Sequence, residues 1–456
     1  MRSAINKFSS LFLLLILFSL FVSGCNSDSS EPTESSNDDT GSVAILLTDA
    51  PIDNFDRFML TVSEISLLGD EGAVVLFRGS ETLDLLNLQS HADLFSLSDG
   101  VPAGNYYKIR MQISDPQLIR LGLNGAIEEI VEPKMGGNGK LDLNPRADIV
   151  VVAGETVALQ VDLDVGKSIH VVQNGNHAYR FRPVIFVDIL TYGVNGKLVR
   201  ISGSVSDKSD EGFELCSGDD ETRFNDDHCV YVYTGEQTVY FDETGGVVNS
   251  PSLQEEDTIT VLGYYRNRED RHVGLDAEII EMAAGDVYQS FYGIVDSMDV
   301  SNRQLVLRDK QGLLTSIMFY PESKLFSMSG TPMTLDDLYV DANVKIEGVY
   351  IEGESLVKAA AIFIESPVEI AESLAGNILR LHEDLSGFDM TDDALGDVCV
   401  ALDENTDIYL LTIEDGHFSS EEVGISALQA GQHLEVYGSF NLGCFVAENI
   451  LLERLD

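Results

Sequence analysis

Three aspartates near the start of the folded chain are the first candidates for metal chemistry. Asp49, Asp53 and Asp56 lie close together in the segment TDAPIDNFD. Ca²⁺ takes six to eight oxygen ligands, and carboxylates supply them. The spacing differs from that of an EF-hand loop, and Asp beside Pro also builds turns by hydrogen bonding to nearby backbone. A calcium site and a structural turn are therefore both open, and no other cofactor is expected.

A second pair of acids, Asp162 and Asp164, lies on the polar face of a predicted strand. Two carboxylates that face each other across a cleft can hydrolyse a polysaccharide by acid/base catalysis. Two acids on one strand face do not meet that condition alone. A solvent-facing strand is therefore the main interpretation, and a hydrolase using paired carboxylates is the alternative.

Other catalytic patterns are missing from the sequence. The eight histidines show neither H-x-x-x-H nor H-E-x-x-H spacing, and no G-x-S-x-G elbow occurs. The segment from Gly136 to Lys140 is followed by Leu141, where a phosphate-binding loop needs Ser or Thr. We therefore predict no catalytic residue and a protein that is not an enzyme.

The four cysteines at positions 216, 229, 399 and 444 predict disulfides. An even number of cysteines fits an exported protein in an oxidising compartment. We favour Cys216 with Cys229 and Cys399 with Cys444, because each pair then lies within one of the repeats described below. A zinc site made by all four thiolates is the alternative, but the sequence has no C-x-x-C spacing.

The first 25 residues have the layout of an export signal. Arg2 and Lys7 precede an apolar run from Leu11, and Val22-Ser-Gly-Cys25 ends it with small residues. The run is shorter than the roughly 20 residues that span a bilayer. Its last four residues resemble the lipobox of bacterial lipoproteins. That resemblance implies that residues 1–24 are a signal peptide and that Cys25 carries lipid.

The residues after Cys25 bear on location. Position 26 is Asn, whereas Asp there tends to retain such lipoproteins in the inner membrane, so the resemblance implies a lipid-anchored protein of the outer membrane, periplasmic or surface-exposed. Residues 26–40 contain nothing to form a core, so we predict that 25–40 is a disordered tether. The chain from residue 25 carries 26 Lys and Arg against 76 Asp and Glu, a formal charge of −50. Such a charge repels nucleic acid and anionic headgroups.

Alternating hydrophobicity predicts an all-β chain. Tyr107 to Ile113 and Val157 to Val165 place apolar and polar residues at every second position, as in antiparallel strands with one wet face. Turn signals separate about nine short strands between residues 41 and 194, which indicates an antiparallel β-sandwich. Only Ser90 to Leu97 is predicted to be helical, for two turns.

Four ordered motifs in this unit carry a family resemblance. They are Leu46-Leu-Thr-Asp-Ala-Pro51, Val101-Pro-Ala-Gly-Asn-Tyr106, Val161-Asp-Leu-Asp-Val-Gly-Lys-Ser-Ile169 and Tyr179-Arg-Phe-Arg-Pro-Val184. Together they resemble an uncharacterised domain of bacterial lipoproteins, a domain of unknown function. The second motif also resembles those of prealbumin-like (or Ig-like) and carbohydrate-binding-like sandwiches. Neither resemblance implies an activity.

The rest of the chain contains an internal repeat of 80 to 90 residues. Gly203, Gly293 and Gly376 open the units, and strands ending in Gly263, Gly348 and Gly438 recur in them. Single glycines inside short strands suit small closed barrels, and the units resemble OB-like repeats of exported proteins. We predict repeats at 195–284, 285–368 and 369–456 after the sandwich at 41–194.

These observations favour a non-enzymatic structural or recognition module of the cell envelope or surface. The expected partners are the membrane, through the lipid anchor, and an envelope protein or polysaccharide; nucleic acid is not expected. A polysaccharide hydrolase and a calcium-dependent adhesion module are the alternatives.

Overall fold

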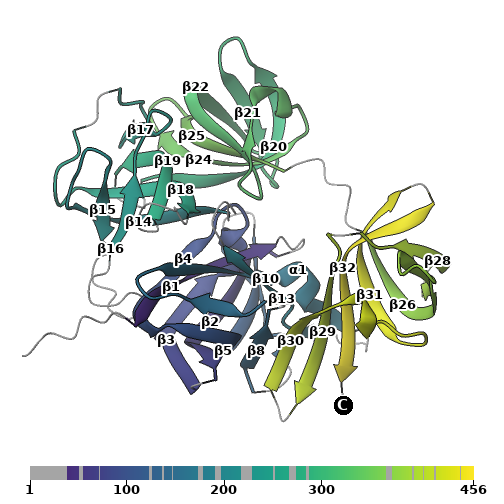
Figure 1. The fold of residues 1–456 in the computed structure, drawn as a ribbon. Helices are drawn as coiled ribbons and strands as arrows, with labels where there is room; N and C mark the ends of the chain where they lie inside the picture. The colour runs from purple at the N-terminus through teal and green to yellow at the C-terminus, as the bar shows by residue number, and fades with distance from the viewer. Residues whose placement is uncertain are drawn as a thin grey trace, which may run out of the picture. The chain divides into compact units, whose positions relative to one another are not determined.

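A computed structural model describes residues 39–455, with gaps at 51–54, 71, 123–125, 136–137, 146, 173–177, 191–196, 217–228, 250–251, 267–273, 284–286, 366–371, 393–394, 404, 415–416 and 442. The predicted signal peptide, Cys25, residues 26–38 of the predicted tether and Asp53 lie outside the described residues. Residues 39–456 form one compact unit. The unit is all-β, as predicted (Figure 1).

One sheet of the N-terminal sandwich has the strand order β13-β10-β1-β4. These strands are β1 (Thr40–Ala50), β4 (Asp93–Pro102), β10 (Thr156–Asp164) and β13 (Ile185–Leu190). Contrary to the fully antiparallel prediction, β1 and β10 are parallel, from Ser42 opposite Thr156 to Ala50 opposite Asp164. Parallel neighbours need a long crossover, and the chain between them supplies it by building the opposite sheet.

The opposite sheet is centred on β5 (Gly104–Leu121), which pairs with β2 (Arg57–Gly69), β6 (Ile127–Val131), β8 (Lys140–Asn144) and β9 (Ile149–Val151). β3 (Gly72–Asp84) pairs with β2. Buried residues of both sheets form one core, in which the rings of Phe77 and Phe95 meet edge to face at 4.7 Å. The alternating apolar residues of β5 and β10 supply that core, as the sequence predicts.

The prediction of a helix from Ser90 to Leu97 is wrong. Ala44 to Leu47 of β1 pair with Asp93 to Leu97, so this segment is mostly strand. Its apolar residues fit a helix and a half-buried strand equally well, and pairing with β1 decides between them. The helical turns are instead η1 (Leu85–Leu88) and α1 (Val165–Ser168).

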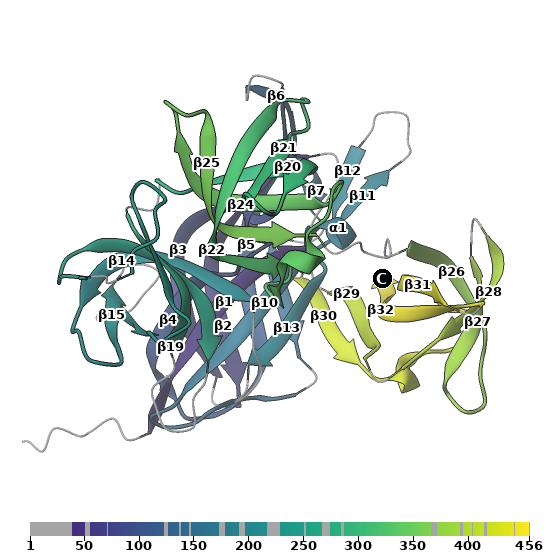
Figure 2. The ribbon, with the colours of Figure 1, turned by 90° about the horizontal axis from the view of Figure 1, so that it is seen from above.

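A small separate sheet joins β7 (Lys134–Met135) to the hairpin of β11 (Ile169–Val172) and β12 (Ala178–Phe181). Figure 2 shows this hairpin beside α1. Within the described part of the chain, no helix is long and apolar enough to cross a membrane.

The first two repeats are small barrels; in each, five strands of a six-stranded sheet close into a ring. The first contains β14 (Leu198–Ser206), β15 (Gly212–Cys216), β16 (Cys229–Tyr233), β17 (Val239–Asp242), β18 (Thr258–Arg266) and β19 (Gly274–Met282). The second contains β20 (Gln289–Asp299), β21 (Gln304–Arg308), β22 (Leu314–Ser327), β23 (Pro332–Met333), η2 (Leu335–Asp337), β24 (Asn343–Ile351) and β25 (Leu356–Ile364). The parallel pairs β16–β19 and β22–β25 close the two rings.

The third repeat has the same strand order within a larger sheet. It contains β26 (Glu372–Leu381), β27 (Gly387–Asp392), β28 (Gly396–Ala401), β29 (Asp407–Glu414), β30 (His417–Val423), η3 (Ile425–Ala427), β31 (His433–Asn441) and β32 (Cys444–Leu455). Parallel pairing of β28 with β32 closes the ring.

The recurring glycines have a packing reason. Register shifts occur at Gly263, Gly348 and Gly438, so each lies at an irregularity between the last two strands of its ring. A Cβ atom on Gly376 would lie 1.8 Å from the carbonyl oxygen of Thr391. Glycine therefore recurs where two backbones approach too closely for a side chain.

The third repeat is joined to the sandwich by strand pairing. β30 pairs in parallel with β8, from Phe418 opposite Leu141 to Glu421 opposite Asn144. The amide of Asn144 donates to the hydroxyl of Ser419 at 2.9 Å. The sandwich core also takes in Tyr409, Leu411, Phe418 and Leu451 of the repeat. One edge of the sandwich is thus completed from within the chain.

Candidate binding cleft

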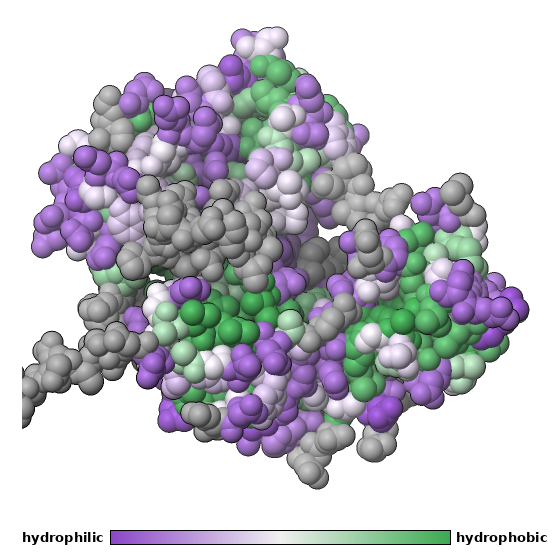
Figure 3. Space-filling model, viewed as in Figure 1, coloured by the Kyte–Doolittle hydropathy of each residue, from purple (hydrophilic) through white to green (hydrophobic). Residues whose placement is uncertain are grey.

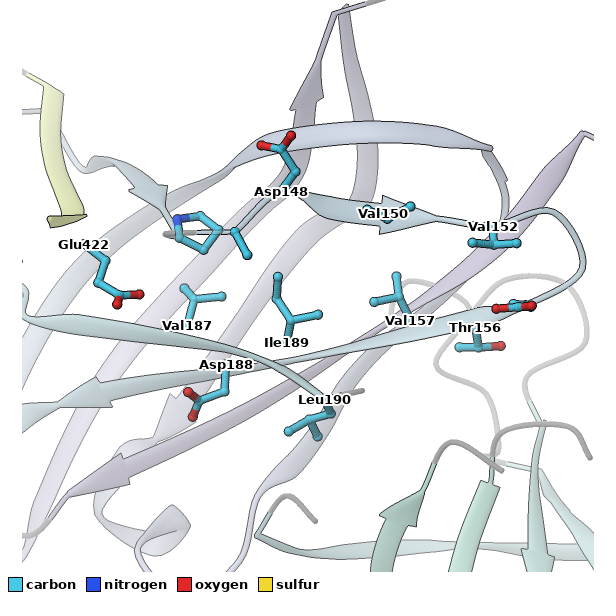
Figure 4. A pocket seen from close by; sticks show the side chains of 13 residues that line it. Asp148, Val150, Val152, Thr156, Val157, Val187, Asp188, Ile189, Leu190 and Glu422 are labelled. Atoms are coloured by element: carbon cyan, nitrogen blue, oxygen red, sulfur yellow. The ribbon is translucent and has the colours of Figure 1, made fainter. Parts of the chain in front are cut away.

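A cleft of about 500 Å³ opens along one side of the sandwich, between β9 in one sheet and β13 with the start of β10 in the other. Figure 4 shows the side chains that line it, with Val187, Ile189 and Val157 between the two layers. The cleft lies where the two sheets diverge and no further strand bridges them in the described part of the chain.

Two strand edges border this cleft. β8 pairs with Ile109 to Gln112 of β5, and β9 pairs with Gly104 to Tyr106, so β8 and β9 form successive parts of one sheet edge. β30 covers the β8 part. Among the described strands, β9 pairs only with β5 and β13 only with β10. Backbone donors and acceptors along such edges are a template for an added strand.

The interior of the cleft is apolar, and the described residues that line it include no aromatic side chain. Val150 is 51% exposed and Val152 is 44% exposed, which is high for a strand that otherwise packs against a core. The other apolar lining residues are Pro145, Ala147, Val157, Val187, Ile189 and Leu190. On the face shown in Figure 3, hydrophobic side chains gather over the sandwich and over the third repeat.

The rim of the cleft is acidic. Asp148, Glu155, Asp188 and Glu422 line it, and none of the described lining residues is basic. Arg146 lies outside the described residues. In Figure 4, Asp148 stands before β9, Asp188 lies on β13, and Glu422 reaches in from β30. The arrangement suits a ligand with an apolar face and positive charge.

The described members of the predicted calcium site, Asp49 and Asp56, accept hydrogen bonds from backbone amides. Asp49 is fully buried; its Oδ1 accepts a hydrogen bond from the Val165 amide at 3.0 Å, and its Oδ2 has no partner among the described residues. Burial raises the pKa of Asp49 well above its ordinary value, more than the Val165 hydrogen bond lowers it. This buried side chain, bonded to a backbone amide, is not placed to gather Ca²⁺ ligands together with Asp56.

Asp56 serves the backbone as well. Its Oδ2 accepts a hydrogen bond from the Leu121 amide at 2.8 Å. Within the described residues, neither Asp49 nor Asp56 belongs to a group of three close potential metal ligands, and Asp53 lies outside those residues. These contacts favour the structural interpretation of the TDAPIDNFD segment.

Asp162 and Asp164 do not form a solvated strand face. Asp164 is 3% exposed and caps α1, accepting a hydrogen bond from the Lys167 amide at 2.8 Å. Asp162 Oδ1 is buried without a partner among the described residues, and burial raises the pKa of this acid. The first repeat covers this face: Lys197 Nζ donates to the Thr48 hydroxyl at 2.6 Å. Neither acid lines the cleft.

Both predicted disulfides are present. Cys216 is bonded to Cys229 and Cys399 to Cys444, with Cα–Cα distances of 3.9 and 4.8 Å. In the described part of the chain, the two groups of potential metal ligands, Glu214 with Cys216 and Cys229, and His382 with Asp389 and Cys399, each include a disulfide sulfur. Because the thiolate is the metal-binding form of cysteine, these groups are disulfide surroundings.

A buried charge network was not predicted from the sequence. Lys345 and Glu347 on β24 are each 2% exposed, and their Nζ and Oε1 atoms are 2.8 Å apart. Arg200 on β14 contacts Glu347 at 3.4 Å and Glu281 on β19 at 2.5 Å. The network joins the first two repeats to each other.

The same network reaches the sandwich through the residues after η1. Lys345 Nζ donates to the hydroxyl of Ser90 at 2.6 Å, and burial lowers the pKa of His91 to about 3, aided by nearby Lys345. A serine beside a lysine occurs in some hydrolases, but Ser90 is 1% exposed and cannot meet a substrate. The network is therefore structural, and alternating Lys and Glu on a strand gives no sequence signal of such burial.

Comparison with known proteins identifies one region of the chain. Residues 40–183 match the family described as a domain of unknown function (DUF4382). The match confirms the resemblance to an uncharacterised domain and covers about a third of the chain. It contains β1 to β12, whereas β13 and β30, which complete the cleft, lie beyond it. No curated protein matches the chain.

Proposed function

We propose that this protein is a lipid-anchored, non-enzymatic recognition module of the bacterial outer membrane that binds a partner protein in the cleft between β9 and β13. The observation that carries the proposal is the pair of strand edges on either side of an apolar cleft. Main-chain edges bind protein segments by hydrogen bonding, and the neighbouring pockets select side chains.

The lining of the cleft favours binding over hydrolysis. A glycosidase places two carboxyl groups on either side of the scissile bond, at roughly 5–10 Å from each other. Asp162 and Asp164, the acids considered for that role, do not line the cleft. Asp164 is also held by the Lys167 amide. Aliphatic side chains form the interior of the cleft, and its four acids, Asp148, Glu155, Asp188 and Glu422, stand at the rim, where they can attract positive charge on a bound partner.

The lining also favours a protein over a polysaccharide. Val150, Val187 and Ile189 offer methyl groups, and the described lining includes no Phe or Tyr. The chain as a whole has no Trp. Aliphatic side chains beside an open strand edge match the alternating residues of an extended peptide, in which every second side chain points to the same face.

The anchor part of the proposal rests on the resemblance of the segment ending at Cys25 to a lipobox. A lipidated cysteine would hold the module at the membrane, because several acyl chains anchor a protein firmly where one binds marginally. Mass spectrometry of the mature amino terminus tests this. A mass for diacylglyceryl and acyl groups on Cys25 is expected, and an unmodified amino terminus would contradict it.

Site-specific photo-crosslinking in intact cells tests the binding part. The full chain is made with a photoreactive amino acid at Val150, in the cleft, or at Val75 on β3, which is similarly exposed at 42% against 51%. We expect a discrete protein adduct from position 150 and none from position 75. The proposal fails if position 150 gives no protein adduct, or if both positions give the same adducts.

A further inference from the structure

Resting on the proposed function, we infer that the occupant of the cleft is an extended, positively charged segment of a partner protein, which adds a strand at the edges of β9 and β13. This segment has apolar residues at alternate positions and basic residues between them.

Strand addition already occurs on this sheet edge. β30 pairs with the β8 part of the edge, although residues 418 and 141 are far apart in the sequence. The edge continues into β9, where Val150 is 51% exposed. A second segment laid along β9 and β13 would continue what β30 begins. The hydroxyl of Ser420 on β30 already donates to the carbonyl of Ile185 at 3.4 Å, so the part of β13 that lines the cleft is Val187 to Leu190. Because a strand rises about 3.3 Å per residue, these four residues offer room for roughly 13 Å of extended chain.

Alternation in the ligand follows from the two sides of the cleft. An added strand would turn every second side chain toward the methyl groups of Val150, Val187 and Ile189. The side chains between them would point the other way, to the face of β13 on which Asp188 lies between Val187 and Ile189. Asp148, two residues before Val150, adds negative charge beside the apolar positions. Lys or Arg at those positions complements the rim, and Asp or Glu there would be repelled.

Charge also excludes two occupants from the chain itself. The tether sequence NSDSSEPTESSNDDT has several acids, no Lys or Arg, and no large apolar side chain to fill the cleft. A second copy would bring a formal charge near −50 and the same acidic rim. Both would meet like charge, so a basic segment of another protein fits better. Attraction between opposite charges also predicts that salt weakens binding.

A peptide titration tests the charge and the spacing. The full chain, in detergent, is titrated with a short fluorescent peptide that alternates lysine and valine. The comparison peptides alternate glutamate and valine, or hold the same lysines and valines in two separate blocks. We expect the alternating lysine peptide to bind at least about tenfold more tightly than either comparison peptide, with the affinity falling as salt rises.

Variants locate the binding. The pair Asp148→Asn and Asp188→Asn removes two rim charges, and the pair Val150→Ser and Val152→Ser removes apolar surface. The matched controls are Glu352→Gln with Glu354→Gln, two exposed acids of the second repeat, and Val75→Ser. We expect the cleft variants to weaken binding about tenfold and the controls less than twofold. Circular dichroism and melting curves check that each variant remains folded.

Hydrogen exchange separates strand addition from loose electrostatic attraction. The bound peptide is expected to slow exchange of backbone amides in β9 or β13, since an added strand hydrogen bonds to them. The inference is overturned if no amide there is protected, if the glutamate peptide binds equally well, if the cleft variants bind normally, or if spermine displaces the peptide by binding to the same acids alone.

The two proposals fail in different ways. A protein adduct at Val150 without preferential binding of the lysine peptide would overturn the basic, alternating segment and leave the proposed function standing. Lack of any adduct at Val150, together with lack of peptide binding, would overturn both.

Discussion

Removing Lys345 should destabilise the junction of the sandwich with the first two repeats. Lys345 and Glu347 have side chains that are each 3% exposed, with 2.8 Å between Nζ and Oε1. In Lys345→Met, Glu347 stays buried with Arg200 at 3.4 Å as its remaining strong partner. Breaking a buried ion pair by removing one member typically costs about 3–5 kcal/mol, and we expect a loss of free energy of unfolding in that range.

The double variant Lys345→Met with Glu347→Met separates the cost of an unpaired charge from the value of the pair. Replacing both partners by apolar groups of similar size is often neutral or stabilising. We therefore expect the double variant to be more stable than Lys345→Met alone, and within about 1–2 kcal/mol of the unmodified protein, because Ser90 loses its partner. Urea unfolding at neutral pH, followed by circular dichroism, gives the free energies.

The pH dependence supplies an independent readout. Burial by itself would raise the pKa of Glu347, but Lys345, Arg200 and His91 outweigh it and lower the pKa from 4.5 to about 2. A lowered acid pKa stabilises the fold above the unfolded pKa, near 4.5, and this stabilisation is lost as pH falls toward 2. Lys345→Met should shrink the loss in that window. The reasoning is refuted if Lys345→Met costs under about 1 kcal/mol, or if the double variant is no more stable than the single one.

Three further predictions concern a disulfide, a buried acid and a glycine. Replacing both Cys399 and Cys444 by Ala should cost about 4 kcal/mol on the chain-entropy model, for a sequence separation of 45, and urea titration of the reduced and oxidised forms measures it; equal stability would contradict the pairing. Because burial raises the pKa of Asp49, the unmodified protein should lose stability relative to Asp49→Asn as pH rises from 4 to 7, with a slope of up to about 1.4 kcal/mol per pH unit until the folded-state pKa is reached; parallel pH curves of the urea midpoint would contradict this. Gly376→Ala places a Cβ 1.8 Å from a neighbouring carbonyl oxygen and should cost about 1–3 kcal/mol, whereas Gly353→Ala, with open space around it, should melt within a degree or two of the unmodified protein.

Period-two patterns predicted the strands that lie at the centre of the sandwich. The alternation from Tyr107 to Ile113 fits because one face of β5 packs on the core and the other carries charge, as in the contact of Arg110 with Asp142 at 2.6 Å. The same signal failed at Leu94 to Leu97, where closely spaced apolar residues fit both a helix and a strand. Pairing with β1 makes this segment a strand. Local patterns therefore predicted the strands in which apolar and polar residues alternate strictly. Where the pattern fits both a helix and a strand, pairing with a strand distant in the sequence determines the structure.

The candidate cleft could not be predicted because its parts meet only in the fold. Val150 and Ile189 belong to strands with ordinary sequences, and Glu422 comes from the last repeat. Asp162 was expected in solvent because its strand alternates, but its Oδ1 is buried, and Lys197 of the first repeat donates to Thr48, the partner of Asp162 on β1. A sequence shows which side chains share a strand face, and it does not show which later domain will cover that face.

The cysteine pairs were predictable for a different reason. Each disulfide joins two cysteines of a single repeat, so the boundaries of the internal repeat indicate which cysteines pair. The glycine at the irregular strand junction, as at Gly438, was also visible as a recurrence along the chain. Features that repeat along the chain can be found without a structure, whereas features built between unlike domains cannot.

Pairing of β30 with β8 ties the maturation of the sandwich to the last part of the chain. As the polypeptide emerges from the amino terminus, residues 141–144 are made long before residues 418–421, which cover them. Until then β8 presents an open ladder that can pair with other chains. Products cut before residue 417 would keep that ladder open, so premature termination should yield sticky, protease-sensitive fragments rather than a shorter working protein.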